Sequence, residues 1–324
     1  MDKPIKIGIF GAWRGSSMAK QLKLAGAKIV AVCDHNPTRL ESTKAYLAEG
    51  GALYSSFDEF IEHPMDGVYV ANYFNQHVPY IVRFLDRGIP ACTEPICGGA
   101  MADCVTLVRA VERSRGKAIL MFGENYPFAP AIQEMRRVYA TGDLGELVYA
   151  HGEYVHPASA DDRCKLAPGR NHWRHYLPAT YYNSHSLAPL TYVTNTMPKV
   201  VTTQAVHVEE YHKNTARMMD PCGMMMTTMD NGAIFTTCGC MGGSTHGNWY
   251  RFACCRGSME TTRFKASKLQ IRYNSLRAVH THQLAAAVNA ATGHLVYRQR
   301  KWLPARRRGR GTEAILALTR SYSL

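Results

Sequence analysis

Two glycines and an acid near the start of the chain have the types and spacing needed to hold a dinucleotide. Gly11 and Gly15 form a turn after the apolar run Ile5–Phe10, and Asp34 closes the next apolar run, Ile29–Cys33. Glycine lets backbone approach a pyrophosphate at a helix N-terminus, and a carboxylate after the second strand accepts hydrogen bonds from ribose hydroxyls. The spacing favours a dinucleotide-binding βαβ unit, although an ordinary α/β turn also fits the glycines alone.

The glycine pattern is incomplete. In a G-x-G-x-x-G motif beginning at Gly11, the second and third glycines are replaced by Trp13 and Ser16. Ser16 or Ser17 is expected to cap the helix, because its side-chain oxygen can accept a bond from a free backbone N–H. The turn residues expected to contact the cofactor are Gly11, Trp13, Arg14 and Gly15.

The charge beside the ribose site indicates which dinucleotide is held. The carboxylate of Asp34 would repel a 2′-phosphate. His35 and Arg39 could offset that repulsion. NAD is therefore favoured over NADP.

Alternating strands and helices must position these groups. A mostly parallel, doubly wound sheet covered on both faces is expected over residues 1–122. Cys104, Leu107, Val108 and Val111 are expected to face inward from one of its helices. The predicted helices are 38–49, 76–87 and 101–113, and the further strands are 68–71, 89–93 and 118–122.

A second domain, of the α+β class, is expected over residues 123–275. A crossover helix at 125–139 precedes a change to alternating apolar residues, which is typical of a largely antiparallel open sheet. Asn231-Gly232 predicts a type I′ hairpin turn. The irregular loop 157–178 is a natural place for site side chains. Strands are predicted at 147–151, 200–208, 223–229, 233–240, 251–253, 258–262 and 268–272.

Composition excludes several classes. The chain has 324 residues, of which 46% are hydrophobic and 19% charged, and no apolar run is near membrane-spanning length. Its ten cysteines are scattered and form no C-x-x-C, so reduced thiols, no metal site and a cytoplasmic location are expected. The first strand begins almost at Met1, so no signal peptide is expected.

The net charge of +13 comes mostly from residues 277–324, which carry eight Arg and one Lys against Glu313 alone. Nucleic-acid binding is therefore not expected. Residues 276–324 are expected to be an atypical basic tail, with a helical candidate at 284–291. Three interpretations stay open: a disordered tail, a reading frame shifted near Arg272–Leu276, and a functional basic tail.

Together with the first unit, the runs Cys92–Cys104 and Tyr181–Leu190 give the chain a resemblance to the Gfo/Idh/MocA oxidoreductase family over residues 4–273. The resemblance implies a Rossmann domain followed by an α+β domain, and NAD or NADP chemistry on sugars or cyclitols. The family motif E-K-P can be aligned in two ways: Glu94 matches its Glu and Pro95 its Lys, or Pro95 matches its Pro and Glu94 its Lys. The lysine is absent under either alignment. That lysine helps deprotonate the reacting hydroxyl, and neither Glu nor Pro can replace its charge.

The second resemblance site is a histidine on the first helix of the C-terminal domain. His185 matches it, and the pattern Tyr-x-x-His-x-Leu-x-Pro is similar to the family's NAD-dependent glycosidase branch, as is the Glu124-Asn125 pair. The resemblance gives catalytic roles to His185, Tyr182 and Glu94. For His185 a structural role in the helix is the alternative.

The remaining expected contacts also rest on the resemblance. Asn72 and His77 match the ends of a loop beside the cofactor, although His77 more readily caps or packs. Arg174 could hold a sugar or carboxylate, or lie on a solvated loop. The expected cofactor contacts beyond the glycine turn are Asp34, Asn72, His77, Glu94 and Asn125, and the expected substrate contacts are Arg174, Tyr126 and Asn183.

These expectations leave two enzymatic functions and one non-catalytic one. The first is an NAD(P)-dependent oxidoreductase that transfers a hydride from a ring hydroxyl of a sugar. The second is a redox-assisted glycoside hydrolase without net NAD turnover. The third is a non-catalytic or truncated dinucleotide-binding relative. A carbohydrate is the expected small-molecule partner, and a homo-oligomer through the C-terminal sheet is expected.

Overall fold

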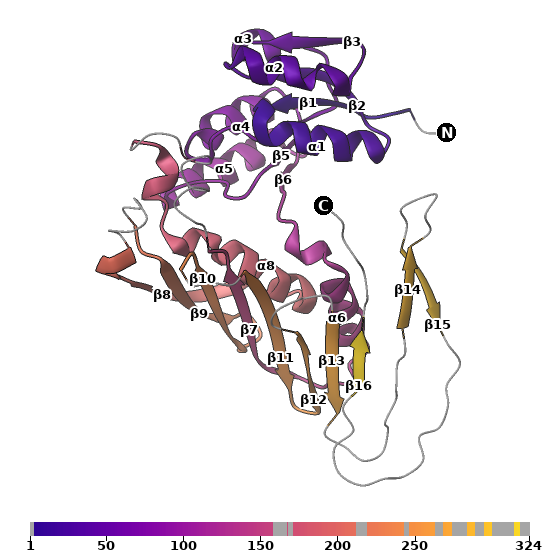
Figure 1. The fold of residues 1–324 in the computed structure, drawn as a ribbon, viewed down its shortest axis with the longest axis vertical. Coiled ribbons are helices and arrows are strands. Elements are labelled where there is room, and N and C mark those ends of the chain that lie inside the picture. The colour runs from indigo at the N-terminus through magenta and orange to yellow at the C-terminus, as the bar shows by residue number, and fades with distance from the viewer. Residues whose placement is uncertain are drawn as a thin grey trace. The chain divides into compact units, whose positions relative to one another are not determined.

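The computed structural model describes residues 3–157, 167, 171–211, 219–242, 246–262, 268–273, 284–288, 295–299 and 314–317. The chain divides into two compact units, Met1–Glu124 and Asn125–Leu324. Figure 1 labels the elements of both units. Each unit is described by itself.

The first unit is a six-stranded sheet in the order β3-β2-β1-β4-β5-β6, and every neighbouring pair is parallel. The predicted doubly wound α/β fold is therefore confirmed. The strands are β1 (Lys6–Phe10), β2 (Lys28–Cys33), β3 (Leu47–Tyr54), β4 (Gly67–Val70), β5 (Ala91–Thr93) and β6 (Leu120–Phe122). The helices are α1 (Ala12–Leu24), α2 (Pro37–Thr43), α3 (Phe57–Phe60), α4 (His77–Asp86) and α5 (Met101–Ser114), with short 3-10 turns η1 (Lys44–Tyr46) and η2 (Phe74–Gln76).

Apolar side chains on both faces of this sheet explain its stability. β4 is buried throughout, as expected of a central parallel strand. On one face, Phe10 packs with Phe60 and Phe84, and on the other, Ile9 packs with Ile29 and Tyr69. The two clusters hold the carboxyl ends of β1 and β4 side by side.

Two predictions for this unit are wrong. The helix predicted for residues 38–49 ends at Thr43, and Leu47–Tyr54 is strand β3, because pairing with β2 prevails over local helix propensity. Helix α5 does not bury Cys104, Val108 or Val111. Its contact with α4 needs a narrower stripe, which Leu107 and Ala110 supply.

The second unit contains an eight-stranded sheet in the order β16-β13-β12-β11-β7-β10-β9-β8. All of its pairs are antiparallel except β10 with β7, so the largely antiparallel sheet is confirmed. The strands are β7 (Leu147–Val155), β8 (Pro198–Val206), β9 (Cys222–Met229), β10 (Ile234–Cys240), β11 (Gly247–Cys254), β12 (Gly257–Thr261), β13 (Lys268–Tyr273) and β16 (Ala314–Ala317).

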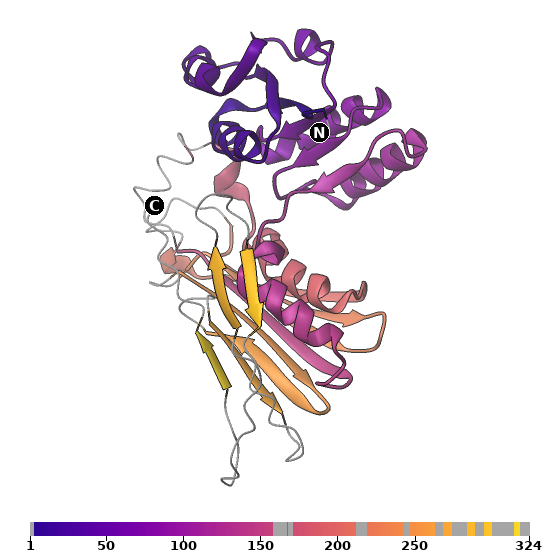
Figure 2. The same cartoon turned by 90° about the vertical axis from the view of Figure 1, so that its right-hand side faces the viewer.

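Two helices cover one face of this sheet (Figures 1 and 2). They are α6 (Pro130–Ala140) and α8 (Asn183–Thr194), with the 3-10 turns η3 (Tyr126–Phe128), η4 (Trp173–Tyr176) and η5 (Ala179–Tyr182) nearby. The predicted stripe Ile132, Met135 and Val138 is buried against the sheet. The helix predicted to start at Asn125 begins at Pro130, because proline suits the first helical position but not the interior.

The hairpin between β9 and β10 is confirmed, but its predicted type I′ turn is wrong. Only Gly232 has a positive φ, of 83°, whereas a type I′ turn needs positive φ at two central residues. Its N–H donates to the carbonyl of Met229 at 3.0 Å, so Gly232 is the fourth residue of the turn.

The helix predicted at 284–291 is also wrong. Leu284–Val288 is strand β14, which pairs antiparallel with β15, Leu295–Gln299. Residues 276–283, 289–294, 300–313 and 318–324 of the predicted basic tail lie outside the described residues.

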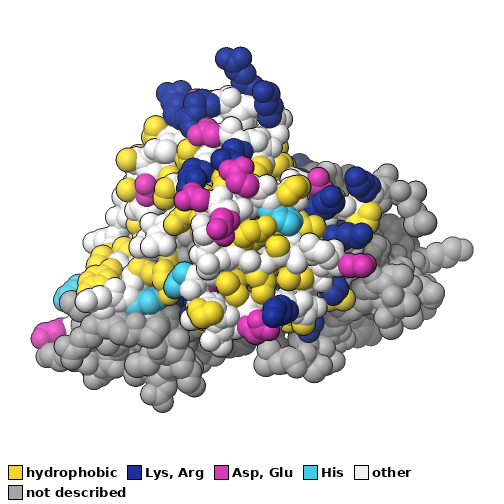
Figure 3. All heavy atoms as spheres, turned by 90° about the horizontal axis from the view of Figure 1, so that it is seen from above, with side chains coloured by type: hydrophobic (Ala, Val, Ile, Leu, Met, Phe, Trp, Pro, Cys, Tyr) yellow, Lys and Arg dark blue, Asp and Glu magenta, His cyan; other side chains and the backbone are white. Residues whose placement is uncertain are grey.

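No described helix has both the length and the apolar character needed to cross a membrane. Figure 3 shows Lys and Arg side chains lying among Asp and Glu side chains on the face in view. Exposed ion pairs such as Arg83–Asp58 and Arg113–Asp86 belong to this mixed surface. A mixed surface gives no single-sign field that would steer a polyanion.

Candidate functional site

The turn between β1 and α1 is built around Gly11. Its φ is 97°, and a Cβ there would lie 2.5 Å from the carbonyl carbon of Ala71 and from the backbone nitrogen of Asn72. Its N–H donates to the carbonyl of Cys33 at 2.8 Å. Only glycine can therefore bring this turn so close to the end of β4.

Helix α1 begins at Ala12, and Gly11 stands at its N-cap without a side-chain cap. The cap predicted at Ser16 or Ser17 is wrong, since Ser16 lies inside the helix and its hydroxyl donates to the carbonyl of Trp13 at 2.9 Å. The first-turn N–H groups of a helix have no intrahelical acceptor. The N-terminus of α1 can therefore receive an anion.

Asp34 connects this turn to the next one. Its Oδ2 accepts a hydrogen bond from the Ala12 N–H at 2.8 Å, and its Oδ1 accepts one from the Asn36 N–H at 2.9 Å. The side chain is buried. Each carboxylate oxygen can accept more than one bond, so Asp34 still has acceptor capacity for a hydroxyl.

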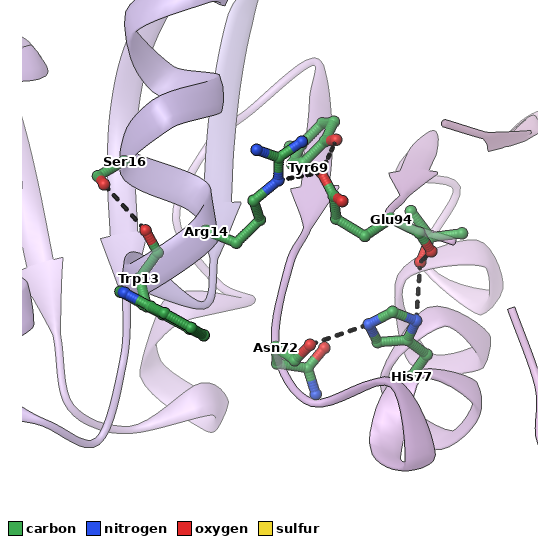
Figure 4. Close-up of polar contacts among 8 residues, drawn as sticks. Trp13, Arg14, Ser16, Tyr69, Asn72, His77 and Glu94 are labelled. Atoms are coloured by element: carbon green, nitrogen blue, oxygen red, sulfur yellow. Dashed lines mark hydrogen bonds and ion pairs between the residues drawn. The ribbon is translucent and has the colours of Figure 1, made fainter. Parts of the chain in front are cut away.

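Arg14, Glu94 and Tyr69 form a second polar cluster in this unit (Figure 4). The Nε of Arg14 lies 3.1 Å from the Oε1 of Glu94, and the Tyr69 hydroxyl donates to the same oxygen. Burial, followed by the charge of Glu94, raises the pKa of Tyr69. Tyr69 therefore stays protonated and holds the carboxylate in place.

Asn72 and His77 follow β4 and lie beside each other (Figure 4). The ring of His77 is buried and contacts the carbonyls of Ile96 and Asn72 and the hydroxyl of Thr93. Burial lowers its pKa. These contacts favour the packing interpretation of His77 over cofactor contact.

Unlike the ring of His77, the side-chain amide of Asn72 lacks hydrogen-bond partners. Both its Nδ2 and its Oδ1 are buried without a hydrogen-bond partner. A buried amide without partners costs about 1–3 kcal/mol. A bound group with a donor and an acceptor would offset this cost, so Asn72 fits the predicted cofactor contact.

An aromatic cluster surrounds His185 in the second unit. Its ring centroid lies 4.6 Å from that of Tyr154 and 4.8 Å from that of Tyr126. Tyr182 lies 5.9 Å away on the preceding turn. The Tyr250 hydroxyl donates to the backbone carbonyl of His185 at 2.8 Å and fixes this part of α8.

Arg174 joins this cluster through Tyr182. Its Nη1 donates to the Tyr182 hydroxyl at 2.9 Å, and its guanidinium carbon lies 4.7 Å from the ring centroid of Trp173. Burial, followed by the charges of Arg174 and His175, lowers the pKa of His172. Arg174, Tyr126, Tyr182 and His185 thus come from separate segments to one part of the second unit.

Two other residues predicted to contact ligands, Asn183 and Asn125, lie outside this aromatic cluster. Asn183 is buried, its Nδ2 donates to the Gly223 carbonyl at 3.3 Å, and its Oδ1 accepts from Ser186 at 3.2 Å. It fastens α8 to β9 and offers no exposed amide to a substrate. Asn125 is exposed and begins the second unit.

Sequence reasoning missed Tyr69 and Tyr154. Both are buried in strands, where a tyrosine is usually interpreted as a core residue without a functional role. A tyrosine hydroxyl needs a partner when buried, which is the signal that could have found Tyr69. Tyr154 shares the helix-facing side of β7 with Ala150 and Gly152, so alternation could have placed it beneath α8.

A protein-family model described as "Oxidoreductase family, NAD-binding Rossmann fold", GFO_IDH_MocA, matches residues 5–122. This match agrees with the parallel sheet, the Gly11 turn and Asp34. It covers the first unit almost completely and none of the second.

Curated relatives fall into two groups. An inositol 2-dehydrogenase from Ralstonia nicotianae is 24% identical over 162 residues, which are 48% of this chain and 48% of the relative. A glycosyl hydrolase family 109 protein from Shewanella woodyi is 22% identical over 205 residues, which are 59% of this chain and 44% of the relative. The chain thus spans about half the length of the curated relatives it matches.

Solved structures share the fold of both units. A levoglucosan dehydrogenase in complex with NADH and L-sorbose has a TM-score of 0.70 at 15% identity, over 92% of this chain and 80% of that one. An oxidoreductase from Agrobacterium radiobacter in complex with NAD⁺, L-tartaric acid and magnesium has a TM-score of 0.68 at 17% identity, over 84% and 77%.

Proposed function

Starting from the premise that the chain belongs to the Gfo/Idh/MocA oxidoreductase family, we propose that it is an NAD-dependent enzyme that oxidises a ring hydroxyl of a sugar or sugar derivative. The observation that carries this proposal is the uncapped N-terminus of α1 beside Asp34, within the part that matches the family model. The inositol and levoglucosan dehydrogenases among its relatives support the class of substrate.

The first unit supplies the groups that would hold NAD. The backbone of Gly11 to Gly15 meets the pyrophosphate, and the carboxylate of Asp34 accepts hydrogen bonds from ribose hydroxyls. Asn72 supplies the amide that lacks a partner. When bound there, NAD would supply the hydride acceptor for the carbon whose hydroxyl is oxidised.

Glu94 and Arg14 together replace the family lysine. The Oε1 of Glu94 is occupied by Arg14 and Tyr69, so Oε2 is the oxygen that accepts the proton of the reacting hydroxyl. Arg14 supplies the positive charge that glutamate lacks and stabilises the developing alkoxide. In the redox-assisted hydrolysis described next, His185, with Tyr182 beside it, would carry the proton transfers of the elimination. Tyr126 and Arg174 hold the substrate.

Redox-assisted glycoside hydrolysis is the second candidate. It is favoured by the family 109 relatives and by the tyrosine-rich surroundings of His185. In that reaction the ring hydroxyl is oxidised, a base removes the neighbouring acidic proton, and the glycosidic bond breaks by elimination. The steps then reverse with water, so NAD is regenerated.

One pair of assays distinguishes the candidates. Purified full-length chain is given NAD with a panel of hexoses and cyclitols, and absorbance at 340 nm follows NADH. The same preparation is given aryl α-N-acetylgalactosaminides, and aryl release is followed. Net NADH with free sugars supports dehydrogenation, whereas aryl release without net NADH supports hydrolysis. Tight NAD binding without either activity supports a non-catalytic relative.

A failure to bind nucleotide would contradict all three functions. If neither NAD nor NADP at millimolar concentration raises the melting temperature, the dinucleotide proposal is wrong. NAD is expected to bind more tightly than NADP, because Asp34 repels a 2′-phosphate.

We also propose that two copies pair through the outer face of the eight-stranded sheet and that the chain works in the cytoplasm. Val200, Met224 and Met226 are exposed on β8 and β9, which supports such a contact. Light scattering is expected to give at least twice the monomer mass, and Met226→Glu is expected to lower it.

A further inference from the structure

We propose that the substrate of this site carries a carboxylate and that Arg174 binds it. This inference rests on the proposed function, because it names the chemical class of the sugar derivative. Sugar acids such as uronates are the ligands that it favours over neutral hexoses.

Among the residues that the structure describes, none supplies Arg174 with a negative charge. Its Nη1 donates to the neutral hydroxyl of Tyr182, and its backbone N–H to the Nδ1 of His172 at 3.3 Å. Its Nε is buried without a partner. In the described part of the chain, no acidic side chain forms an ion pair with Arg174.

Other arginines of the described chain show the usual arrangement. Arg83, Arg87 and Arg113 are paired with Asp58, Glu62 and Asp86 on the surface. A guanidinium cannot lose its proton in a protein. An arginine that is only partly exposed and has no carboxylate therefore leaves a positive charge that an incoming anion can neutralise.

The side chains described near Arg174 are aromatic rings and imidazoles, which carry no negative charge. The charges of Arg174 and His175 are among the causes that lower the pKa of His172. Further along the cluster, the rings of His156 and His246 lie 4.9 Å apart. A carboxylate placed here would meet cationic and hydrogen-bond donor groups.

The shape of the donors selects a planar anion. With Nη1 engaged by Tyr182, the Nε and Nη2 donors are left, and two parallel donors on one edge of a guanidinium match the two oxygens of a carboxylate. Stacking on Trp173 holds the plane of the guanidinium. The Tyr182 hydroxyl accepts from Arg174, so its own hydrogen can be donated to the ligand.

The test compares acids with uncharged ligands of the same shape. D-glucuronate and D-galacturonate are each titrated against their methyl esters and parent hexoses, into the full-length chain, by calorimetry. Each titration is done with saturating NAD and without nucleotide. Glucose 6-phosphate is included because a phosphate could also use a guanidinium.

In the wild type, at least one acid is expected to bind about 30-fold or more tightly than its methyl ester, the lower end of what a buried charge partner contributes. Arg174→Gln is expected to remove that preference while ester binding changes less than about 3-fold. Arg174→Lys, which keeps the charge but loses the fork, is expected to be intermediate.

Arg251→Gln is the matched control. The Nε of Arg251 is also buried without a partner, and its guanidinium lies 5.8 Å from the Tyr149 ring. Arg251 alternates on β11 with Tyr250, which contacts α8, so Arg251 belongs to the opposite face of the sheet. It is expected to leave the acid preference unchanged. Unchanged NAD affinity in both variants shows that they fold.

Three results overturn the inference. The first is equal affinity for acid and methyl ester in every pair, and the second is an equal loss of acid affinity and ester affinity in Arg174→Gln. The third is tighter binding of glucose 6-phosphate alone, without a preference for either acid over its ester. Absence of nucleotide binding overturns the proposed function instead. The titrations without NAD still report the acid preference in that case.

Discussion

Asp34 is a single residue whose contacts serve both the fold and the proposed cofactor. Asp34→Ala removes the acceptor of two backbone N–H groups, those of Ala12 and Asn36. Since a hydrogen bond to a charged group contributes about 1.5–3 kcal/mol, the variant is expected to lose about 2–4 kcal/mol of unfolding free energy. Urea denaturation measures this loss.

Asp34→Asn is the control for that substitution, because an amide keeps one acceptor and is expected to lose roughly half as much. An alanine variant within about 0.5 kcal/mol of the wild type would show that these bonds do not hold the turn. NAD affinity is expected to fall in both variants.

Glu94 gives a second prediction at the level of one side chain. Glu94→Gln keeps the shape but removes the proton acceptor, so turnover is expected to fall about 100-fold or more. NAD affinity is expected to change less than about 3-fold, since Asp34 and the α1 N-terminus are untouched. Stopped-flow kinetics and calorimetry measure the two quantities.

Tyr69→Phe is the matched variant, because it removes the hydroxyl that positions Glu94 and keeps the carboxylate. Its loss of turnover is expected to be smaller. Wild-type turnover in Glu94→Gln would exclude Glu94 as the base.

Residue types and spacing predict Gly11 and Asp34 as cofactor contacts, and the family resemblance predicts Asn72. Each of them follows a strand at the carboxyl edge of the sheet, and their roles stay predictions. Residue types and spacing were not enough to find pairings that depend on the tertiary fold. Arg14 and Glu94 are separated by 80 residues, and only the order of β1, β4 and β5 brings them together. The unpartnered amide of Asn72 is likewise a property of its surroundings.

Among the elements, the turn from β1 to α1 places the strictest steric limit on the residue it can accept. Gly11→Ala places a Cβ 2.5 Å from backbone atoms of Ala71 at a φ of 97°. Gly26 has a similar φ of 94°, but a Cβ at this position would have no heavy atom within 4 Å. Gly26→Ala is therefore expected to cost about 1 kcal/mol, for the backbone alone, and Gly11→Ala at least about 2 kcal/mol more.

Urea denaturation of both variants measures the difference between them. Equal losses would mean that the contact with β4 does not constrain the turn. Nucleotide binding is expected to weaken only in Gly11→Ala.

The order of the elements was largely predictable, because strands and helices of the first unit alternate with clear periodicity. The errors lie where packing partners decide. Leu47–Tyr54 is a strand because β2 pairs with it, and Leu284–Val288 because β15 does. Helix α5 buries Leu107 and not Val108, because α4 contacts only a narrow stripe.

For the whole molecule, the face in Figure 3 shows no field of a single sign that would attract a polyanion. On that face Lys and Arg side chains lie among Asp and Glu side chains. The four arginines of 306–310, which contribute to the net charge of +13, lie outside the described residues. The predicted domain limits at 122 and 275 stay a prediction, as does the interpretation of the basic tail.

Stability of the whole chain is expected to fall in mild acid. Burial is the main cause that lowers the pKa of His63, His77, His172 and His246 from the ordinary value of 6.5. Because the folded-state pKa lies below the unfolded one, the unfolded chain binds more protons in this range, and stability rises with pH. The stabilisation is complete above pH 6.5 and is lost as pH falls towards each folded-state pKa.

His77 is expected to contribute to this dependence because its ring is buried, and burial is the largest cause that lowers its pKa. The hydrogen bonds to the Asn72 and Ile96 carbonyls and the charge of Glu94 act in the opposite direction. One such histidine changes the unfolding free energy by at most about 1.4 kcal/mol per pH unit. Urea denaturation between pH 5 and 7.5 is expected to give a shallower slope in His77→Gln than in the wild type. If His77→Gln and the wild type give the same slope, protonation of His77 is not coupled to folding, and the acid sensitivity must come from other groups such as His63, His172 and His246.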